Sequence, residues 1–354
     1  MQGSELGEHF VCFINMKHWD FTPKNFGKLL PFVMDENITD ITWDGRALWI
    51  DDILGGRYKS DVILDKDFID SFCQRIADYS NQPFNGYEPL LEAQIEMLRI
   101  SIVHEDTAHT GTSIAIRRTS EVCRLNKESC IADGFCDEET WNLIPKMAQA
   151  KFSCISGGLP GVGKTELLKL YSTFISPSER AIVMEDSPEF HYSILNPNSD
   201  CTEWMINKNF SYEAALKASL RQRPDWNILA EARGRETRYL MENFSSGINV
   251  LTSVHLSDEA DLIPRLRNMI GDPNLADRVE NEIYMRGLVV FVIHRYINED
   301  GIKRRLAQVC FYSNEDTGHT RTLIVKDGKL INKNLPPKIL EKFIRAGFNN
   351  PFEN

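Results

Sequence analysis

The feature that most restricts the fold of this chain is a glycine-rich segment between an expected strand and an expected helix. Residues 158–165 read Gly-Leu-Pro-Gly-Val-Gly-Lys-Thr and satisfy the pattern GxxxxGK[ST] at every fixed position. An apolar strand is expected over 152–156 and a helix from Lys164. In this context the glycines let successive N–H groups face a phosphate, and the helix N-terminus adds partial positive charge. The pattern predicts that Lys164 reaches the β- and γ-phosphates and that the Thr165 hydroxyl ligates Mg²⁺.

A chance glycine-rich turn is the alternative interpretation, but four fixed positions with the correct flanks favour the phosphate site. The residues expected to contact the nucleotide are Gly158, Pro160, Gly161, Val162, Gly163, Lys164, Thr165 and Glu166.

Acidic residues follow two further expected strands, 181–184 and 227–230. The first strand ends in Glu185-Asp186-Ser187-Pro188-Glu189, and Glu231 follows the second. The carboxyl ends of parallel strands open into the crevice where α/β sheets bind ligands, so carboxylates there can meet a metal ion and a water molecule. A single acid at a strand end is usually a solvated loop charge, but two such sites beyond a phosphate loop favour a functional role. Which glutamate among Glu185, Glu189 and Glu231 is the general base stays open.

The expected ligands of Mg²⁺ are Thr165, Glu185 and Asp186. His255 closes a fourth expected strand, 249–254, in the same way. At the edge of a nucleotide crevice it is expected to sense the γ-phosphate or to couple it to the next helix. A structural hydrogen-bonding histidine is the alternative.

The alternation of strands and helices indicates the fold class. From residue 137 onward short apolar strands alternate with helices, which predicts an α/β domain with a parallel sheet over residues 137–320. Helices are expected over 137–150, 211–222 and 236–246.

The first 118 residues are of α+β type and are expected to form a smaller N-terminal domain. A hairpin over 38–50, a helix capped by Asp65, and strands over 94–103 and 112–117 are expected there. The polar segment 119–136 is expected to be a linker, and residues 321–354 a C-terminal tail.

Composition argues against some function classes. The net charge is −11 and no long basic run occurs, which is unlike a protein that reads nucleic-acid sequence, although a local basic channel in an assembly stays open. No stretch reaches the roughly 18 apolar residues of a membrane span, and residues 1–13 lack a signal-peptide pattern, so a cytoplasmic location is expected. The eight cysteines include no CxxC pair and are expected to be reduced packing residues.

Four segments, in this order, resemble the signature boxes of the secretion-superfamily traffic ATPases, which power type II secretion, type IV pili, tight-adherence pili and type IV secretion. Residues 158–165 resemble the Walker A loop of that family and residues 185–189 its Asp box. Residues 220–237 look like its atypical Walker B region, and residues 252–255 with Arg265 are similar to its His box.

The N-terminal third joins this resemblance. The strands that carry Arg99 and Arg117-Arg118 resemble the family segment that supplies phosphate-contacting arginines. Ala230 stands where the family usually has glycine, and Glu166 where threonine or serine is commoner; residues 81–94 match only loosely. No catalytic group of the family is missing, so the resemblance implies an active enzyme.

The resemblance implies a RecA-like ATPase domain, ATP and Mg²⁺ as cofactors, and a homo-hexamer. It implies partners in an inner-membrane platform or in other secretion or pilus machine proteins, with peripheral attachment to the inner face of the membrane. In that setting Glu231, Glu185 and Glu189 would orient and deprotonate water, with His255 beside them. Arginines expected to neutralise the γ-phosphoryl charge are Arg99, Arg117 and Arg118, or, across a subunit interface, Arg221, Arg223 and Arg233.

Other interpretations remain open. Another RecA-like motor such as a helicase would share the phosphate loop, and DNA-stimulated turnover would favour it. A nucleotide-gated assembly switch would bind ATP and hardly hydrolyse it. A small-molecule kinase is less favoured because the sequence has no recognisable lid. The cargo, whether pilin, DNA or effector protein, stays open.

Overall fold

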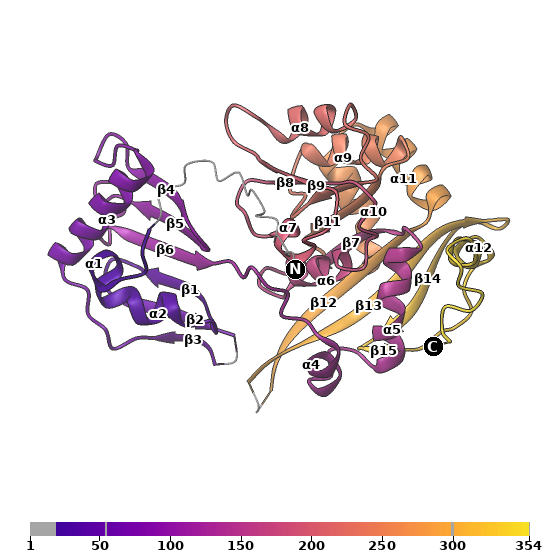
Figure 1. Ribbon diagram of the computed structural model, residues 1–354, viewed down its shortest axis with the longest axis horizontal. Helices are drawn as coiled ribbons and strands as arrows, with labels where there is room; N and C mark the ends of the chain where they lie inside the picture. Colours follow the sequence, from indigo (N-terminus) through magenta and orange to yellow (C-terminus); the bar gives the residue numbers. More distant parts are fainter. Residues whose placement is uncertain (1–18, 54, 299–300, 354) are drawn as a thin grey trace, which may run out of the picture. The chain divides into compact units, whose positions relative to one another are not determined.

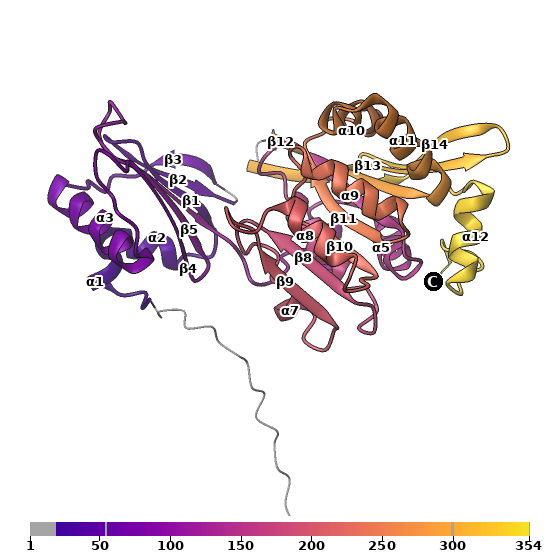
Figure 2. The same cartoon turned by 90° about the horizontal axis from the view of Figure 1, so that it is seen from above.

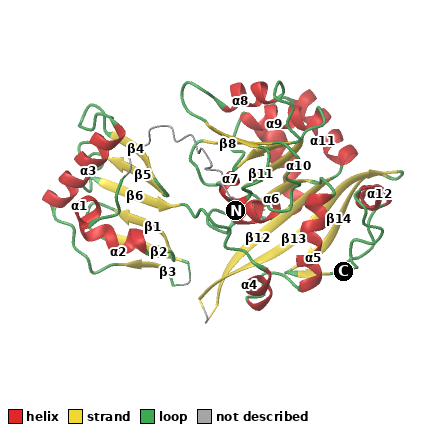
Figure 3. Ribbon diagram, in the orientation of Figure 1, coloured by secondary structure: helices red, strands yellow, loops and turns green. Residues whose placement is uncertain are grey.

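The computed structural model describes residues 19–53, 55–298 and 301–353 (Figure 1). The chain divides into two compact units after Arg118. Each unit is built on its own β-sheet, shown in yellow in Figure 3.

The described part of the first unit holds a six-stranded antiparallel sheet in the order β3-β2-β1-β6-β5-β4. Helices pack on one face of this sheet (Figure 2). The apolar face of α3 supplies Ile69, Phe72 and Ile76 to the buried core, as its 3.6-residue period predicts. The elements are α1 (Pro23–Phe26), α2 (Leu30–Met34), β1 (Ile38–Trp43), β2 (Leu48–Asp52), β3 (Gly56–Lys59), α3 (Lys66–Ser80), β4 (Leu90–Ile95), β5 (Leu98–Val103) and β6 (Ser113–Arg118).

Two local predictions for this unit are confirmed and one is wrong. β1 and β2 form the expected hairpin, and the Asp65 side chain caps α3 by accepting from the Phe68 N–H. The single strand expected over 94–103 is instead the end of β4, a turn and β5. The turn was missed because Glu96, with φ of 50°, occupies a left-handed position that usually signals itself by glycine or asparagine.

The described part of the second unit holds a nine-stranded mixed sheet in the order β15-β14-β13-β12-β7-β11-β10-β8-β9. Its first elements along the chain are α4 (Lys127–Ala132), α5 (Glu138–Gln149), β7 (Ser153–Gly158), α6 (Lys164–Ser172), β8 (Ala181–Glu185), α7 (Tyr192–Leu195), β9 (Cys201–Met205), α8 (Tyr212–Ser219), β10 (Trp226–Leu229) and α9 (Glu236–Ser245). They are followed by β11 (Asn249–Val254), α10 (Leu262–Ile270), α11 (Pro273–Arg286), β12 (Leu288–Asn298), β13 (Gly301–Glu315), β14 (Gly318–Lys326), β15 (Lys329–Leu330) and α12 (Pro337–Arg345).

Two buried cores cover the two faces of this sheet. Helices α5, α6 and α12 pack on one face, and α8 to α11 on the other. Neighbouring strand residues point to opposite cores, as Cys154 and Ile155 of β7 do. A strand buried on both faces is apolar throughout, which is why the strand pattern was readable from the sequence.

The expected parallel sheet is confirmed only in part. Strands β12, β7, β11, β10, β8 and β9 run parallel, but β13, β14 and β15 extend the sheet as an antiparallel meander. Residues 321–354, expected to be a tail, complete β14 and form β15 and α12, and Phe343 is fully buried.

The segment 119–136 also differs from the expected linker. It contains α4, and Cys130, Phe135 and Cys136 are buried in the core of the second unit. With one buried residue in six, α4 is too short to show a helical period. The seven cysteines within the described ranges have free thiols, and Cys12 lies outside those ranges.

None of the helices in the described residues combines the length and the apolar character needed to cross a membrane.

Candidate phosphate-binding site

The backbone of the loop after β7 adopts a conformation that requires glycine at several positions. Gly158, Gly161 and Gly163 have φ of 152°, 74° and 98°. A Cβ on Gly158 would lie 2.5 Å from Val162 Cγ2 and 2.8 Å from the Ile293 carbonyl oxygen, so no side chain fits there. At Gly163 the nearest atom to an added Cβ would be Arg304 Cδ at 4.0 Å, so it is the left-handed φ that disfavours an L side chain.

Lys164 is buried over this loop. Its Nζ donates to the carbonyl oxygens of Gly158 and Leu159, at 3.1 and 3.2 Å, and lies 3.2 Å from His255 Nδ1. Burial lowers the pKa of Lys164, while the nearby Glu231 carboxylate acts in the opposite direction. The ammonium is therefore held by neutral acceptors that a phosphate oxygen can replace.

Parallel pairing brings Glu231 and His255 next to this lysine. β11 lies between β7 and β10, so the residues after β10 and β11 meet beside the phosphate loop. His255 Nε2 lies 2.7 Å from Glu231 Oε1. The site thus contains a continuous series of contacts from Lys164 through His255 to Glu231.

Arg233 holds the other oxygen of the same glutamate. Its NH2 lies 2.8 Å from Glu231 Oε2, and its NH1 lies 4.0 Å from Asp186 Oδ2. The hydrogen bond to Glu231 raises the pKa of Arg233. Arg221 and Arg223 are exposed on the turn before β10, so Arg233 is the member of the three proposed interface arginines that joins this series of contacts.

Glu185 stands apart from this series. It ends β8 with 5% of its surface exposed, and its Oε1 accepts from the N–H groups of Glu189 and Phe190 at 3.2 and 2.9 Å. Burial raises the pKa of Glu185 to about 8. Asp186 is exposed and Glu189 is half-buried. Because both amides bond to Oε1, a metal role for Glu185 falls to Oε2 and requires the carboxyl group to lose its proton.

The segment before α4 contacts the first turn of α6. Glu166 Oε2 accepts from the Arg124 N–H at 2.9 Å, and its Oε1 lies 3.5 Å from Lys169 Nζ. The Glu166 carboxylate is thus engaged with this segment and with its own helix. Thr165 is half-buried, and Pro160 and Gly161 are exposed.

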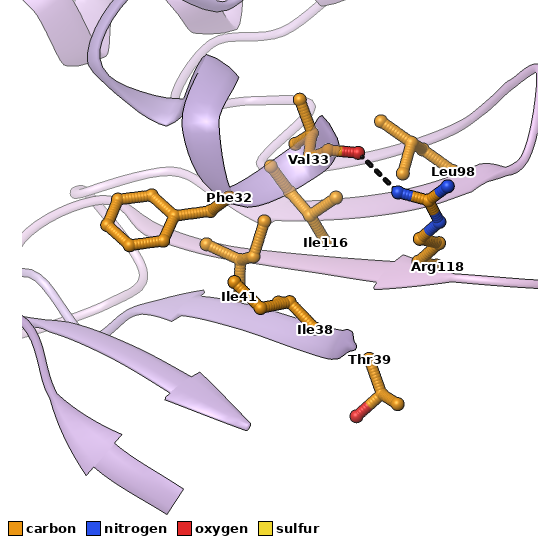
Figure 4. Close-up of a pocket in the computed structure, with 8 residues that line it drawn as sticks. All are labelled: Phe32, Val33, Ile38, Thr39, Ile41, Leu98, Ile116 and Arg118. Atoms are coloured by element: carbon orange, nitrogen blue, oxygen red, sulfur yellow. Dashed lines mark hydrogen bonds between the residues drawn. The ribbon is translucent and has the colours of Figure 1, made fainter. Parts of the chain in front are cut away.

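The three arginines expected to reach phosphate from the N-terminal third all lie in the first unit. Arg117 Nε donates to Asp40 Oδ1 at 2.8 Å, and Arg118 NH1 donates to the Val33 carbonyl at 2.8 Å (Figure 4). Figure 4 also shows Arg118 beside Leu98 and Ile116, so it ties α2 to the sheet. Arg99 lies opposite Arg117 in the β5–β6 pair.

An open pocket of about 240 Å³ adjoins the phosphate loop. Leu159, His255, Ser257, Asp261 and Arg265 are among its lining residues. Arg265 was expected here only through a family resemblance. Arg304 of β13, whose Cδ would lie 4.0 Å from a Cβ on Gly163, was not expected. No sequence signal points to Arg304, because antiparallel pairing brings it to the loop from outside any motif.

A profile of the family described as type II/IV secretion system protein matches residues 91–297. An uncharacterized protein of Bacillus anthracis is 26% identical over 238 residues, or 66% of this chain and 53% of that protein. The chain thus spans about half the length of that relative. The type IV secretion system protein VirB11 of Brucella abortus is 24% identical over 324 residues, covering 81% of this chain and 88% of VirB11.

Solved structures share the fold. The ATPase DotB of Yersinia pseudotuberculosis superposes with a TM-score of 0.61 at 14% identity, covering 94% of this chain and 85% of DotB. The pilus retraction motor PilT, solved with bound ADP, superposes with a TM-score of 0.53 at 14% identity, covering 90% and 86%.

Proposed function

Because the chain belongs to the type II/IV secretion system protein family, we propose that it is a Mg²⁺-dependent ATPase that drives a secretion or pilus-assembly machine. The observation that carries this proposal is the series of contacts Lys164–His255–Glu231 beside a complete phosphate loop. A buried lysine that can bind phosphate and a nearby carboxylate that can accept a proton from water support this proposal.

The residues of the loop fit a Mg-nucleotide. Positive φ at its glycines is the conformation in which successive loop amides can face an anion, and Lys164 donates to two backbone carbonyls that phosphate oxygens can replace. Thr165 would ligate Mg²⁺, which neutralises phosphate charge when it is bound. Glu231 accepts the proton of the attacking water, and His255 orients Glu231 and stands close to the γ-phosphate.

The proposed oligomeric state and location are those that the family resemblance implies. The chain works as a homo-hexamer on the cytoplasmic side of the inner membrane, held there by platform or other machine proteins. Arginines of the first unit, or Arg233 across a subunit interface, neutralise charge on the transferred phosphoryl group. Pilin, DNA and effector protein are alternative cargoes.

The test is Mg²⁺-dependent ATP hydrolysis by the full chain, with mass by light scattering in the presence and absence of nucleotide. Turnover by a hexamer that is lost in both Lys164→Ala and Glu231→Gln supports the proposal. Nucleotide binding by a monomer without turnover, unchanged in Glu231→Gln, would instead favour the nucleotide-gated switch. Stimulation of turnover by DNA would favour a helicase-type motor.

A further inference from the structure

The side of the phosphate loop away from Glu231 carries arginines. β7 is flanked by β11 on one side and by β12 on the other. Glu231 and His255 follow strands on the β11 side. On the β12 side, β12 pairs with β7 only as far as Ile293 opposite Gly158, and then continues past the loop with β13 (Figure 1).

Three arginines gather on this β12 side. Arg295 of β12 lies directly opposite Arg304 of β13, so the two side chains share one face of the ribbon. Burial lowers the pKa of Arg304, and the nearby charges of Arg295 and Arg124 lower it further. Arg124 belongs to the segment whose N–H contacts Glu166 in the first turn of α6.

Among the described residues, Arg304 differs from its two basic neighbours in having no hydrogen-bond or ion-pair partner. Lys303 Nζ lies 3.9 Å from Asp133 Oδ1, and Arg305 NH2 donates to the Tyr296 hydroxyl at 2.9 Å. Within the described ranges no hydrogen bond or ion pair involves the Arg304 guanidinium. Like charges opposite one another destabilise a strand pair, so a half-buried arginine placed there without a carboxylate suits a bound anion.

We propose that Arg304, with Arg295 and Arg124 beside it, binds the α-phosphate of the nucleotide held by the loop. Its side chain lies next to Gly163, and the amides of such a loop cradle the α- and β-phosphates. Lys164 and Glu231 serve the γ-phosphate end, and the arginines serve the opposite end. This inference rests on the proposed function, because it takes the ligand of the loop to be a nucleotide.

The test is the dissociation constant of Mg-ADP for the full chain, with tripolyphosphate measured as a competitor that has phosphates but no base. Arg304→Ala is expected to raise the dissociation constants of both ligands by at least about tenfold, since a charge-assisted hydrogen bond is lost. Arg304→Lys keeps the charge and recovers part of the affinity. Lys303→Ala, the adjacent cation with its own partner, stays within about twofold. The melting temperature of Arg304→Ala is not lowered, because no hydrogen bond or ion pair among the described residues is removed and a like-charge pair is relieved.

Each other outcome has a definite meaning. Unchanged ADP binding in Arg304→Ala overturns this inference and leaves the proposed function standing. Weaker ADP binding with unchanged tripolyphosphate binding also overturns it, because Arg304 would then contact the base. A wild-type chain that binds no ADP removes the proposed function and this inference together.

Discussion

At the scale of single residues, the side chains of the site are held in place by partners that they share. Glu231 is the point where two of them meet, with His255 at one carboxylate oxygen and Arg233 at the other. A carboxylate that must accept a proton from water needs a fixed orientation and one oxygen that can be released. Arg233 therefore has a positioning role toward Glu231.

Replacing this arginine gives the first prediction. Arg233→Ala should lower kcat for ATP by about 10- to 100-fold, because Glu231 loses the partner that orients it. The dissociation constant of ADP should change less than about threefold, since the lysine and the loop amides are intact. Steady-state hydrolysis and ADP titration measure the two effects. Arg235→Ala, two residues along and exposed, is the matched control. An equal loss of binding and turnover would mean that Arg233 binds nucleotide directly.

Glu185 gives a pH dependence. Burial raises its pKa to about 8 from the ordinary 4.5, so the folded state keeps a proton that the unfolded state has released between these values. Stability should therefore fall as pH rises from about 4.5 to 8, with a slope of up to about 1.4 kcal/mol per pH unit from this group. Glu185→Gln stays neutral and can keep accepting from the loop amides.

The measurement is urea unfolding of both proteins at pH 5 and pH 7.5. The stability of Glu185→Gln relative to wild type should increase between these two values. Parallel pH profiles would show that Glu185 ionises in the folded protein as it does in the unfolded chain.

At the scale of elements, the sequence was informative where one strand or helix carries its own signal. Strands buried on both faces, the capped helices α3, α5 and α8, and the loop after β7 were predictable, whereas the capped helix α4 was not. The antiparallel strands β13 to β15 were not, because their burial depends on pairing with β12 rather than on a local period. For the same reason Arg304 could not be connected to the loop.

The cap of α5 shows how an element is joined to a distant strand. Asp137 Oδ1 accepts from the Thr140 N–H at 2.8 Å, and Oδ2 accepts from the Leu330 N–H of β15 at 2.9 Å. Capping is visible in sequence, whereas the second bond spans residues that no pattern connects. One carboxylate thus fixes both the start of a helix and the edge of the sheet.

We expect Asp137→Ala to lower the free energy of unfolding by about 2–4 kcal/mol, the sum of a lost cap and a lost hydrogen bond to a charged group. Asp272→Ala is the comparison, since the Asp272 side chain caps α11 by accepting from the Leu275 N–H and its loss should cost about 1 kcal/mol. Urea unfolding gives the totals, and hydrogen exchange locates the change. Faster exchange at the Leu330 amide in Asp137→Ala should accompany the loss. An Asp137→Ala cost no greater than that of Asp272→Ala would show that the contact with β15 contributes nothing.

At the scale of the whole molecule, the question is what the first unit contributes to turnover. In this unit Arg118 donates to the α2 carbonyl of Val33, and Arg117 is paired with Asp40. Arg99 has no hydrogen bond or ion pair to another described residue, and it lies opposite Arg117 on the same face. Of the three arginines, Arg99 is therefore the one that can bind a phosphate without breaking an existing hydrogen bond or ion pair.

If the first unit completes the active site in the working assembly, Arg99→Ala should lower kcat by about 10³-fold, the lower end of what arginine contacts to a transferring phosphoryl group contribute. The melting temperature should not change, because Arg99 makes no contact that the fold uses. Arg118→Ala should do the opposite and lower the melting temperature, since its contact with α2 is lost. Arg57→Ala, an exposed arginine of the same unit paired with Asp51, serves as the surface control. Wild-type turnover in Arg99→Ala would place the phosphate-neutralising arginine elsewhere, and Arg233 from a neighbouring subunit would be the next to test.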